Sequence, residues 1–471
     1  GGLALLAASA LAAAGLPAAA SRPDLGAHHA PRRPGERSAV LIVIDTLRAD
    51  RVSAYGHTVQ TTPRMDRLAA SGARFEAAYS SSSWTAPAVA SLFSGLPLSR
   101  HGVSGIETPF TTSPTLAERL SGQGMVTAGF SANPLVSSLY GFERGFKTFV
   151  SSRSGLIHPV VGLSEGTMLG RFLSRPIDPD RMLVEQARTW LAAHAADRFF
   201  LYVHLMAPHR PYEPPEEFRG RMVEPYEGVE YQGGRPGEVL PGPALRNVLQ
   251  RYDAEVAYAD SLVGELLDTL SRLGLDRSTV VAVTSDHGEA FGEHGRWEHG
   301  QALYAEETRI PMMVRVPGAA PGRILKRPVS LMDLHPTLLA LLDAPAGPAG
   351  LPEGYAGVDL TDAIHGRART EPHPVLSEIL GEKGTVHPET LDAVVLGDIR
   401  LIRNHTLGTQ ELFDVAADPG ETQPLDRPSL VTTLQRYMAP AWWERATDLA
   451  GRTIKLSDED VERLKSLGYI R

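Results

Sequence analysis

The stretch Ser38-Ala39-Val40-Leu41-Ile42-Val43-Ile44-Asp45 decides the fold of this chain. Its first seven residues form a nearly continuous apolar run of strand length, which is typical of a strand buried on both faces of a parallel sheet. Asp45 follows directly, at the carboxyl end of the predicted strand. Ligands of open α/β sheets bind at this edge, so we expect Asp45 to lie in a functional site.

Two more apolar runs lead into polar residues in the same way. Residues 199–205 lead into His209, and residues 279–284 lead into Asp286 and His287. Parallel strands place their carboxyl ends at one edge of a sheet, so these side chains are expected to lie near Asp45.

Helical patterns alternate with these strands. One helix is predicted from Pro63, with Thr62 as its N-cap, to a stop at Gly72. Residues 251–273 carry apolar side chains at the spacing of one helical face. The alternation predicts an α/β fold, a doubly wound sheet flanked by helices. A Pro- and Gly-rich stretch then separates a larger α/β domain of residues 38–345 from a smaller C-terminal α+β domain of residues 346–471.

Composition narrows the classes of function. The 471 residues include 46 Lys and Arg against 55 Asp and Glu, a net charge of −9. This balance argues against a polyanion-binding face, so no nucleic-acid partner is expected, although a small anionic substrate remains compatible. The absence of cysteine excludes disulfides, thiolate zinc sites and any catalytic aldehyde derived from cysteine.

The first 20 residues are rich in Ala and Leu, and polar residues follow from Ser21. This pattern is typical of a signal-peptide core and its cleavage region, followed here by a linker at residues 21–37. A membrane anchor is the alternative, although Gly15 and Pro17 interrupt the apolar segment. We therefore expect an exported protein, periplasmic or extracellular, with any membrane association made through this segment alone.

Four segments resemble the sulfatase branch of the alkaline phosphatase superfamily, in the expected order. The first, residues 41–50, contains Asp45, and the second is Ser83-Trp84-Thr85-Ala86-Pro87-Ala88-Val89 with the short helix that ends at Gly95. The third is His204-Leu205-Met206-Ala207-Pro208-His209, and the fourth is Ser285-Asp286-His287-Gly288-Glu289. The resemblance implies the alkaline-phosphatase and sulfatase fold and a hydrolase that acts on ester bonds.

The resemblance also implies a set of site residues. Asp45, Asp286, His287 and the hydroxyl of Thr85 would hold one divalent metal ion, Zn²⁺, Mn²⁺ or Ca²⁺. A cation there would lower the pKa of the Thr85 hydroxyl and make it a nucleophile, aided by a helix that begins around Pro87. His209 and His299 would hold the ester oxygens and protonate the leaving group, and Asn133 would bind the substrate.

Departures from the sulfatase pattern indicate the substrate class. Thr85 stands where sulfatases have the Cys or Ser that becomes formylglycine, so no formylglycine is expected. Thr46 replaces a second metal-binding Asp, and the family's Lys-Trp-His segment is missing. A phosphorylated Thr can be hydrolysed at phosphorus, whereas a sulfated Thr lacks the second hydroxyl through which sulfatases eliminate sulfate. We therefore expect a small anionic ester of the phosphate type, cleaved or transferred by an unmodified Thr85.

Two other functions remain open. The first is sulfuric ester hydrolysis, which the family resemblance alone would suggest. The second is a catalytically silent binding module on the same fold. Taken singly, Asp45 and Thr85 could each be an ordinary helix cap. The retained carboxylates argue against a silent module, because buried carboxylates without a cation are costly.

Overall fold

A computed structural model describes residues 32–111, 114–152, 178–345, 356–367, 373–381, 388–438, 441–444, 453–467 and 469. The predicted leader at residues 1–20 and most of the predicted linker lie outside the described residues. Residues 31–471 form one compact unit, to which the description below refers. Within the described residues, no helix combines the length and apolar character that crossing a membrane requires.

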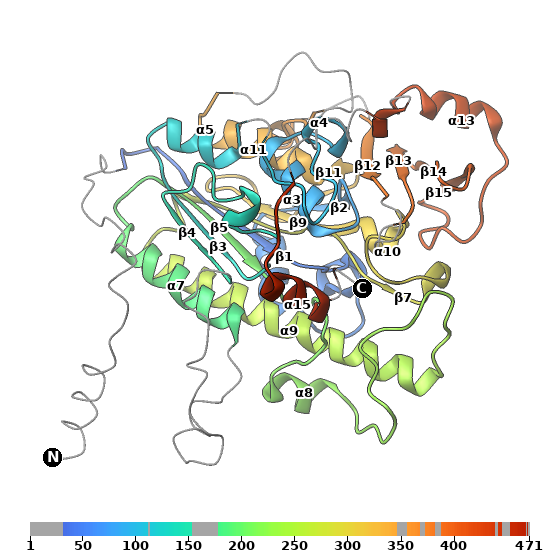
Figure 1. The fold of residues 1–471 in the computed structure, drawn as a ribbon. Helices are drawn as coiled ribbons and strands as arrows, with labels where there is room; N and C mark the ends of the chain where they lie inside the picture. Colours follow the sequence, from blue (N-terminus) through green and yellow to red (C-terminus); the bar gives the residue numbers. More distant parts are fainter. Residues whose placement is uncertain are drawn as a thin grey trace. The chain divides into compact units, whose positions relative to one another are not determined.

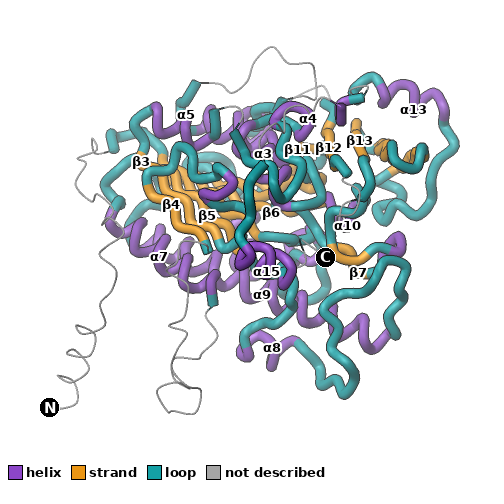
Figure 2. The backbone as a smooth tube through the Cα atoms, in the orientation of Figure 1, coloured by secondary structure: helices purple, strands orange, loops and turns teal. Residues whose placement is uncertain are grey.

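The predicted central strand is at the middle of a nine-stranded mixed sheet (Figures 1 and 2). Strand β1, Ser38–Ile44, pairs in parallel with β5, Phe199–Leu205, on one side and with β6, Thr279–Ser285, on the other. The remaining strands are β2 (Ala73–Tyr79), β3 (Val126–Ser131), β4 (Thr148–Ser151), β9 (Arg309–Arg315), β10 (Arg323–Leu325) and β11 (Val329–Ser330). Strand β9 runs antiparallel to both β6 and β2, which makes the sheet mixed.

Helices cover both faces of this sheet, as Figure 1 shows. Helices α2 (Pro63–Ser71), α7 (Pro179–Ala193) and α9 (Gly242–Arg272) lie on one face, and α3 (Thr85–Ser94), α5 (Leu116–Gly122) and α11 (Leu334–Leu341) lie on the other. Alternate residues of β1 enter two separate cores: Ala39, Leu41 and Val43 pack in the second group, and Val40, Ile42 and Ile44 in the first. The predicted doubly wound α/β fold is confirmed.

The bounds of two helices can be compared with those that the sequence predicts. Helix α2 begins and ends where its Pro and Gly signals predict. Helix α9 begins at Gly242, nine residues before the predicted start at residue 251. The additional residues, 242–250, follow Pro241 and include Pro243 in the first turn. Ala244 and Val248 among them are buried, so tertiary packing extends the helix beyond its most regular apolar face.

A four-stranded antiparallel sheet follows the main sheet in the chain. It consists of β12 (Val375–Ile379), β13 (Leu391–Leu396), β14 (Ile399–Asn404) and β15 (Thr409–Asp414), with α13 (Pro428–Gln435) packed against it. Helix α15, Asp458–Ser466, instead contributes Leu464 to the core of the main sheet. The predicted domain division between residues 345 and 346 stays a prediction.

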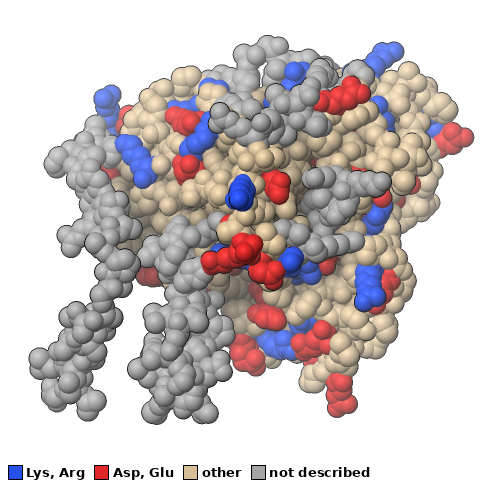
Figure 3. All heavy atoms as spheres, viewed as in Figure 1, with Lys and Arg blue, Asp and Glu red and all other residues tan. Residues whose placement is uncertain are grey.

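The shorter elements connect these parts. They are α4 (Leu98–His101), α8 (Glu216–Met222), α10 (Ala305–Thr308), α12 (Thr361–Ile364), β7 (Ala290–Phe291) and β8 (Trp297–Glu298). On the face drawn in Figure 3, Lys and Arg side chains are interspersed with Asp and Glu. The expected absence of a nucleic-acid partner stays a prediction.

Candidate active site

Three neighbouring strands bring two carboxylates and an imidazole together at the carboxyl edge of the sheet. Asp45 follows β1, Asp286 follows β6, and His204 lies in β5 between them in the chain but beside β1 in space, opposite Val43. His204 Nε2 is 3.8 Å from Asp45 Oδ2 and 3.7 Å from Asp286 Oδ2. All three side chains are fully buried, and their ligand atoms lie within 4.8 Å of one another, close enough to share one metal ion.

His287 faces the same cluster. Its Nε2 is 3.6 Å from Asp45 Oδ1 and 3.6 Å from Asp286 Oδ2. Its Nδ1 lies 2.9 Å from the carbonyl oxygen of Gly288, which can only accept a hydrogen bond. The ring proton therefore belongs on Nδ1, and the Nε2 lone pair points toward the carboxylates, as in a metal-binding histidine held by a backbone carbonyl.

Several polar atoms of this cluster lack hydrogen bonds. Asp45 Oδ1, Asp286 Oδ2 and His204 Nε2 are buried without a hydrogen-bond partner in the described part of the chain. Burial, together with the negative charge of Asp286, raises the pKa of Asp45 well above its ordinary value. Buried carboxylates are normally paired or metal-bound. The donor set of two carboxylates and two imidazoles therefore fits a divalent cation.

Thr85 is the first residue of α3, so this helix begins two residues before Pro87, where the sequence placed its start. Its side chain is fully buried, and Oγ1 lies 3.2 Å from His287 Nε2. Trp84 occupies the N-cap position and its side chain makes no capping bond, so Thr85 is not the cap of this helix. The hydroxyl instead points into the carboxylate cluster, at the end of the helix that favours negative charge.

Asn133 follows β3 and connects the cluster to the hydroxyl. Its Nδ2 donates to Asp45 Oδ2 at 2.5 Å and lies 3.3 Å from Thr85 Oγ1. Its Oδ1 accepts from the backbone N–H of Leu135 at 2.8 Å, which fixes the orientation of the amide. The residue predicted to bind substrate therefore contacts both a carboxylate and the candidate nucleophile.

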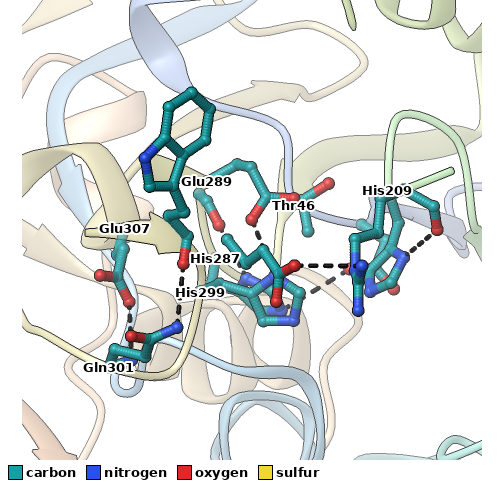
Figure 4. A network of polar contacts seen from close by, with 12 residues as sticks. Thr46, His209, His287, Glu289, His299, Gln301 and Glu307 are labelled. Atoms are coloured by element: carbon teal, nitrogen blue, oxygen red, sulfur yellow. Dashed lines mark hydrogen bonds and ion pairs between the residues drawn. The ribbon is translucent and has the colours of Figure 1, made fainter. Parts of the chain in front are cut away.

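His209 and His299 lie beside one another, and His299 also adjoins His287, as Figure 4 shows. Their ring centroids are 5.0 Å apart, and those of His299 and His287 are 4.5 Å apart. His299 Nδ1 is 3.0 Å from Glu289 Oε1. Burial raises the pKa of Glu289 to about 7. This carboxylate orients the His299 ring and would stabilise a positive charge on it.

His209 is in a different environment. Its Nδ1 donates to the carbonyl oxygen of Arg210 at 2.7 Å, and its buried Nε2 has no hydrogen-bond partner among the described residues. Burial first, and then His299, lower the pKa of His209 well below its ordinary value. A neutral His209 presents a lone pair at Nε2, so it is arranged to accept a proton or a hydrogen bond. Asp180 holds the loop before it by accepting from the N–H groups of Met206, at 2.7 Å, and Ala207, at 2.9 Å.

The structure thus brings together every site residue that the sequence predicted, and it adds His204 and Tyr469. His204 has a signal in the sequence, because a histidine in an otherwise apolar, fully buried strand calls for a polar partner. Tyr469 has no such signal, because its hydroxyl reaches Asn133 from 336 positions away.

Thr46, the residue in place of a second Asp, has a buried Oγ1 without a hydrogen-bond partner in the described ranges. Its backbone N–H donates to Asp286 Oδ1 at 3.3 Å.

Comparisons with known proteins identify the family of this chain. The sequence model of the sulfatase family matches residues 37–344. Choline-sulfatase of Rhizobium meliloti is 27% identical, over 89% of this chain and 89% of that protein. Arylsulfatase of Clostridium perfringens is 24% identical, over 81% of this chain and 88% of that protein.

Solved structures show the same fold. The crystal structure of a phosphonate monoester hydrolase of Agrobacterium radiobacter superposes with a TM-score of 0.67 at 19% identity, over 88% of this chain and 95% of that one. The family model spans well over half of the sequence and includes the strand ends that carry Asp45, His204 and Asp286. The chain therefore belongs to the sulfatase family and is a hydrolase that acts on ester bonds.

Proposed function

We propose that this sulfatase-family hydrolase cleaves or transfers a phosphate-type ester through the unmodified hydroxyl of Thr85. The observation that carries the proposal is the position of Thr85 Oγ1, 3.2 Å from His287 Nε2 at the edge of the carboxylate cluster. A nucleophile needs this kind of placement, beside groups that bind a cation and at a helix N-terminus.

The chemistry of threonine supports phosphorus over sulfur. Thr85 carries a methyl group on Cβ, so it cannot become the aldehyde that formylglycine provides. A phosphothreonine can be attacked by water or an acceptor alcohol at phosphorus, which returns the hydroxyl. A solved phosphonate monoester hydrolase shares this fold, so the fold is compatible with phosphorus esters as substrates.

The donor set supports one divalent cation held by Asp45, His204, Asp286 and His287 beside Thr85. Bound there, a cation would neutralise the two carboxylates and withdraw charge from the Thr85 hydroxyl and the ester oxygens. Two imidazole nitrogens favour Zn²⁺ or Mn²⁺ over Ca²⁺, which prefers oxygen ligands.

The other residues take roles that follow from their contacts. Thr85 Oγ1 loses its proton to solvent and bonds to phosphorus, and the bond from phosphorus to the leaving alcohol breaks. His299, supported by Glu289, donates the proton that the leaving oxygen takes. Water or an acceptor alcohol then attacks phosphorus, and neutral His209 accepts its proton. The bond from phosphorus to Thr85 Oγ1 breaks, and Oγ1 regains a proton from solvent. Asn133 donates its amide to keep the reacting groups in place.

The test compares turnover of p-nitrophenyl phosphate, bis-p-nitrophenyl phosphate and p-nitrophenyl sulfate with added Zn²⁺, Mn²⁺ or Ca²⁺. We expect metal-dependent turnover of the phosphorus esters. Thr85→Ala should abolish it, and Thr85→Ser, which retains a hydroxyl, should preserve part of it. Trapping of a phosphorylated Thr85-containing peptide in rapidly quenched wild-type protein would identify the nucleophile directly.

Sulfuric ester hydrolysis is the second candidate, because full-length relatives are named choline-sulfatase and arylsulfatase. Faster turnover of the sulfate ester than of both phosphorus esters would establish it. An absence of turnover and of divalent-metal binding would instead point to a silent binding module.

We also propose export through residues 1–20. N-terminal sequencing of the mature protein tests this proposal, and an intact leader on the soluble protein would contradict it.

A further inference from the structure

Tyr469 reaches the active site from the opposite end of the chain. Its hydroxyl lies 2.9 Å from Asn133 Nδ2 and 3.4 Å from Thr85 Oγ1. Its ring centroid is 5.3 Å from that of His209 and 6.2 Å from that of His299. The side chain is only 3% exposed. Tyr469 therefore lies among Thr85, Asn133, His209 and His299. The proposed function gives each of these four residues a role in the reaction.

The segment that carries Tyr469 is firmly attached to the main sheet. Ser457 and Asp460 close a capping box at the start of α15, and Leu464 of this helix is 1% exposed. Leu464 and Tyr469 both pack in the core that contains α3, and the Tyr469 N–H donates to the Leu464 carbonyl at 2.9 Å. Arg463 donates to the carbonyl oxygen of Ser152, at 3.0 Å. These contacts fix the segment against the main sheet, so Tyr469 is held in place beside the site.

The hydrogen bonds around Asn133 determine what the Tyr469 hydroxyl can do. The amide has two hydrogens: one is given to Asp45 Oδ2 at 2.5 Å and the other to Tyr469 at 2.9 Å. The tyrosine oxygen is thus an acceptor toward Asn133, and its own hydrogen remains to be donated. Thr85 Oγ1 lies 3.4 Å away, which is long for a hydrogen bond between two hydroxyls. An anionic oxygen in front of Thr85 would use this hydrogen better.

We propose that Tyr469 is a further catalytic residue, whose hydroxyl donates a hydrogen bond to an ester oxygen held in front of Thr85. This inference rests on the proposed function, because it places the reacting phosphorus at Thr85. The ordinary pKa of a tyrosine hydroxyl is about 10, so Tyr469 carries its hydrogen near pH 7. A donor fixed before substrate arrives stabilises the charge that develops on the ester oxygens without having to reorganise.

The experiment compares Tyr469→Phe with Tyr469→Ala in the full chain, using bis-p-nitrophenyl phosphate. Tyr304→Phe is the matched control, because it removes a tyrosine hydroxyl that contacts Glu411 outside the site. We expect Tyr469→Phe to lower kcat about a hundredfold, with KM changed by less than about threefold, because the lost hydrogen bond strengthens in the transition state. The control should keep wild-type kcat.

A merely structural tyrosine would give another result. The shift in melting temperature that Zn²⁺ or Mn²⁺ produces should be the same in wild type and Tyr469→Phe, which shows that the metal cluster is intact. Unchanged kcat in Tyr469→Phe would overturn the proposal. Higher kcat in Tyr469→Phe or Tyr469→Ala would also overturn it, because the ring would then be a plug that excludes substrate.

The same variants separate this inference from the proposed function. If wild type turns over only the sulfate ester, the phosphorus proposal fails, and the predicted loss of kcat is measured with p-nitrophenyl sulfate. If wild type turns over none of the esters, binding of inorganic phosphate and of sulfate is measured by calorimetry. At least about tenfold weaker binding of either anion in Tyr469→Phe would support the hydrogen-bond donor, and equal binding of both would overturn it.

Discussion

At the scale of single residues, His204 has a ring nitrogen, Nε2, that makes no hydrogen bond within the described part of the chain. Its Nδ1 is 2.9 Å from the Tyr202 hydroxyl, which orients the ring, and its Nε2 faces Asp45 and Asp286. Burial lowers the pKa of His204 to about 4, so the ring is neutral near pH 7. In the tautomer whose Nδ1 donates to the Tyr202 oxygen, the lone pair lies on Nε2 and can bind a cation.

We predict that His204→Gln weakens Zn²⁺ or Mn²⁺ binding at least about tenfold, because the imidazole ligand is lost while the site stays polar. Calorimetric titration of the metal-free protein with Zn²⁺ or Mn²⁺ measures this affinity. His335→Gln is the control: it also replaces a fully buried histidine, but one that lies against Gly95 at the far end of α3. Equal metal affinity in both variants would remove His204 from the ligand set.

The sequence predicts some of the site residues and not others. Asp45, Asp286 and His287 could be predicted because each follows an apolar strand, and strand ends converge. His204 lies inside such a strand and not after it, so the strand-end pattern does not include it, although a histidine among apolar neighbours is itself a signal. Tyr469 could not be predicted as a site residue, since only the three-dimensional path of α15 brings it to Thr85.

At the scale of elements, α2 shows a cap supplied from another helix. Thr62 occupies the N-cap position, but its side chain makes no capping bond and its hydroxyl donates to Asp66 at 3.0 Å. Asp260 of α9 instead accepts from the N–H groups of Arg64 and Met65, at 2.9 Å and 2.8 Å. The signal from Thr62 and Pro63 predicted the start of α2 correctly, whereas the group that caps the helix comes from α9.

We predict that Asp260→Ala lowers the free energy of unfolding by about 1–2 kcal/mol, since two N–H groups at the start of α2 lose their acceptor. Asp260→Asn, which keeps an oxygen acceptor, should lose less. Asp268→Ala on the same helix removes only an exposed ion pair with Arg64 and should change stability by less than about 1 kcal/mol. Urea denaturation measures all three, and equal values for Asp260→Ala and Asp268→Ala would contradict the cap.

At the scale of the whole molecule, buried carboxylates make stability depend on pH. Burial, followed by the charge of Asp180, raises the pKa of Glu255 to about 8. In the unfolded chain the pKa of a glutamate is about 4.3. Between these values the unfolded chain releases the proton while the folded chain keeps it, so stability falls as pH rises from about 4 to about 8 and then stays level.

Glu255→Gln should remove this part of the pH dependence. We predict similar stability to wild type near pH 4.5, and greater stability near pH 8 by an amount on the order of 1–3 kcal/mol. Denaturant unfolding at several pH values measures the difference. Glu185→Gln, on the exposed face of α7, is the control and should follow the wild-type curve. A constant difference at all pH values would show that Glu255 is not protonated in the folded protein.

The overall architecture was the most predictable level. An apolar run such as Ser38–Ile44 has to be covered on both faces, and alternating helices are the elements available to cover it. The antiparallel placement of β9 had no counterpart in the sequence, because residues buried on both faces look alike in either direction.

The central position of β1 also determines when this protein can fold. Its neighbour β5 starts about 160 residues later in the chain, and β6 about 240 residues later. At a synthesis rate of about 5–20 residues per second, β1 waits on the order of ten seconds or more for its first partner. During that time an apolar segment with unpaired edges is exposed, and such a segment is prone to aggregate until the middle strands have been translated.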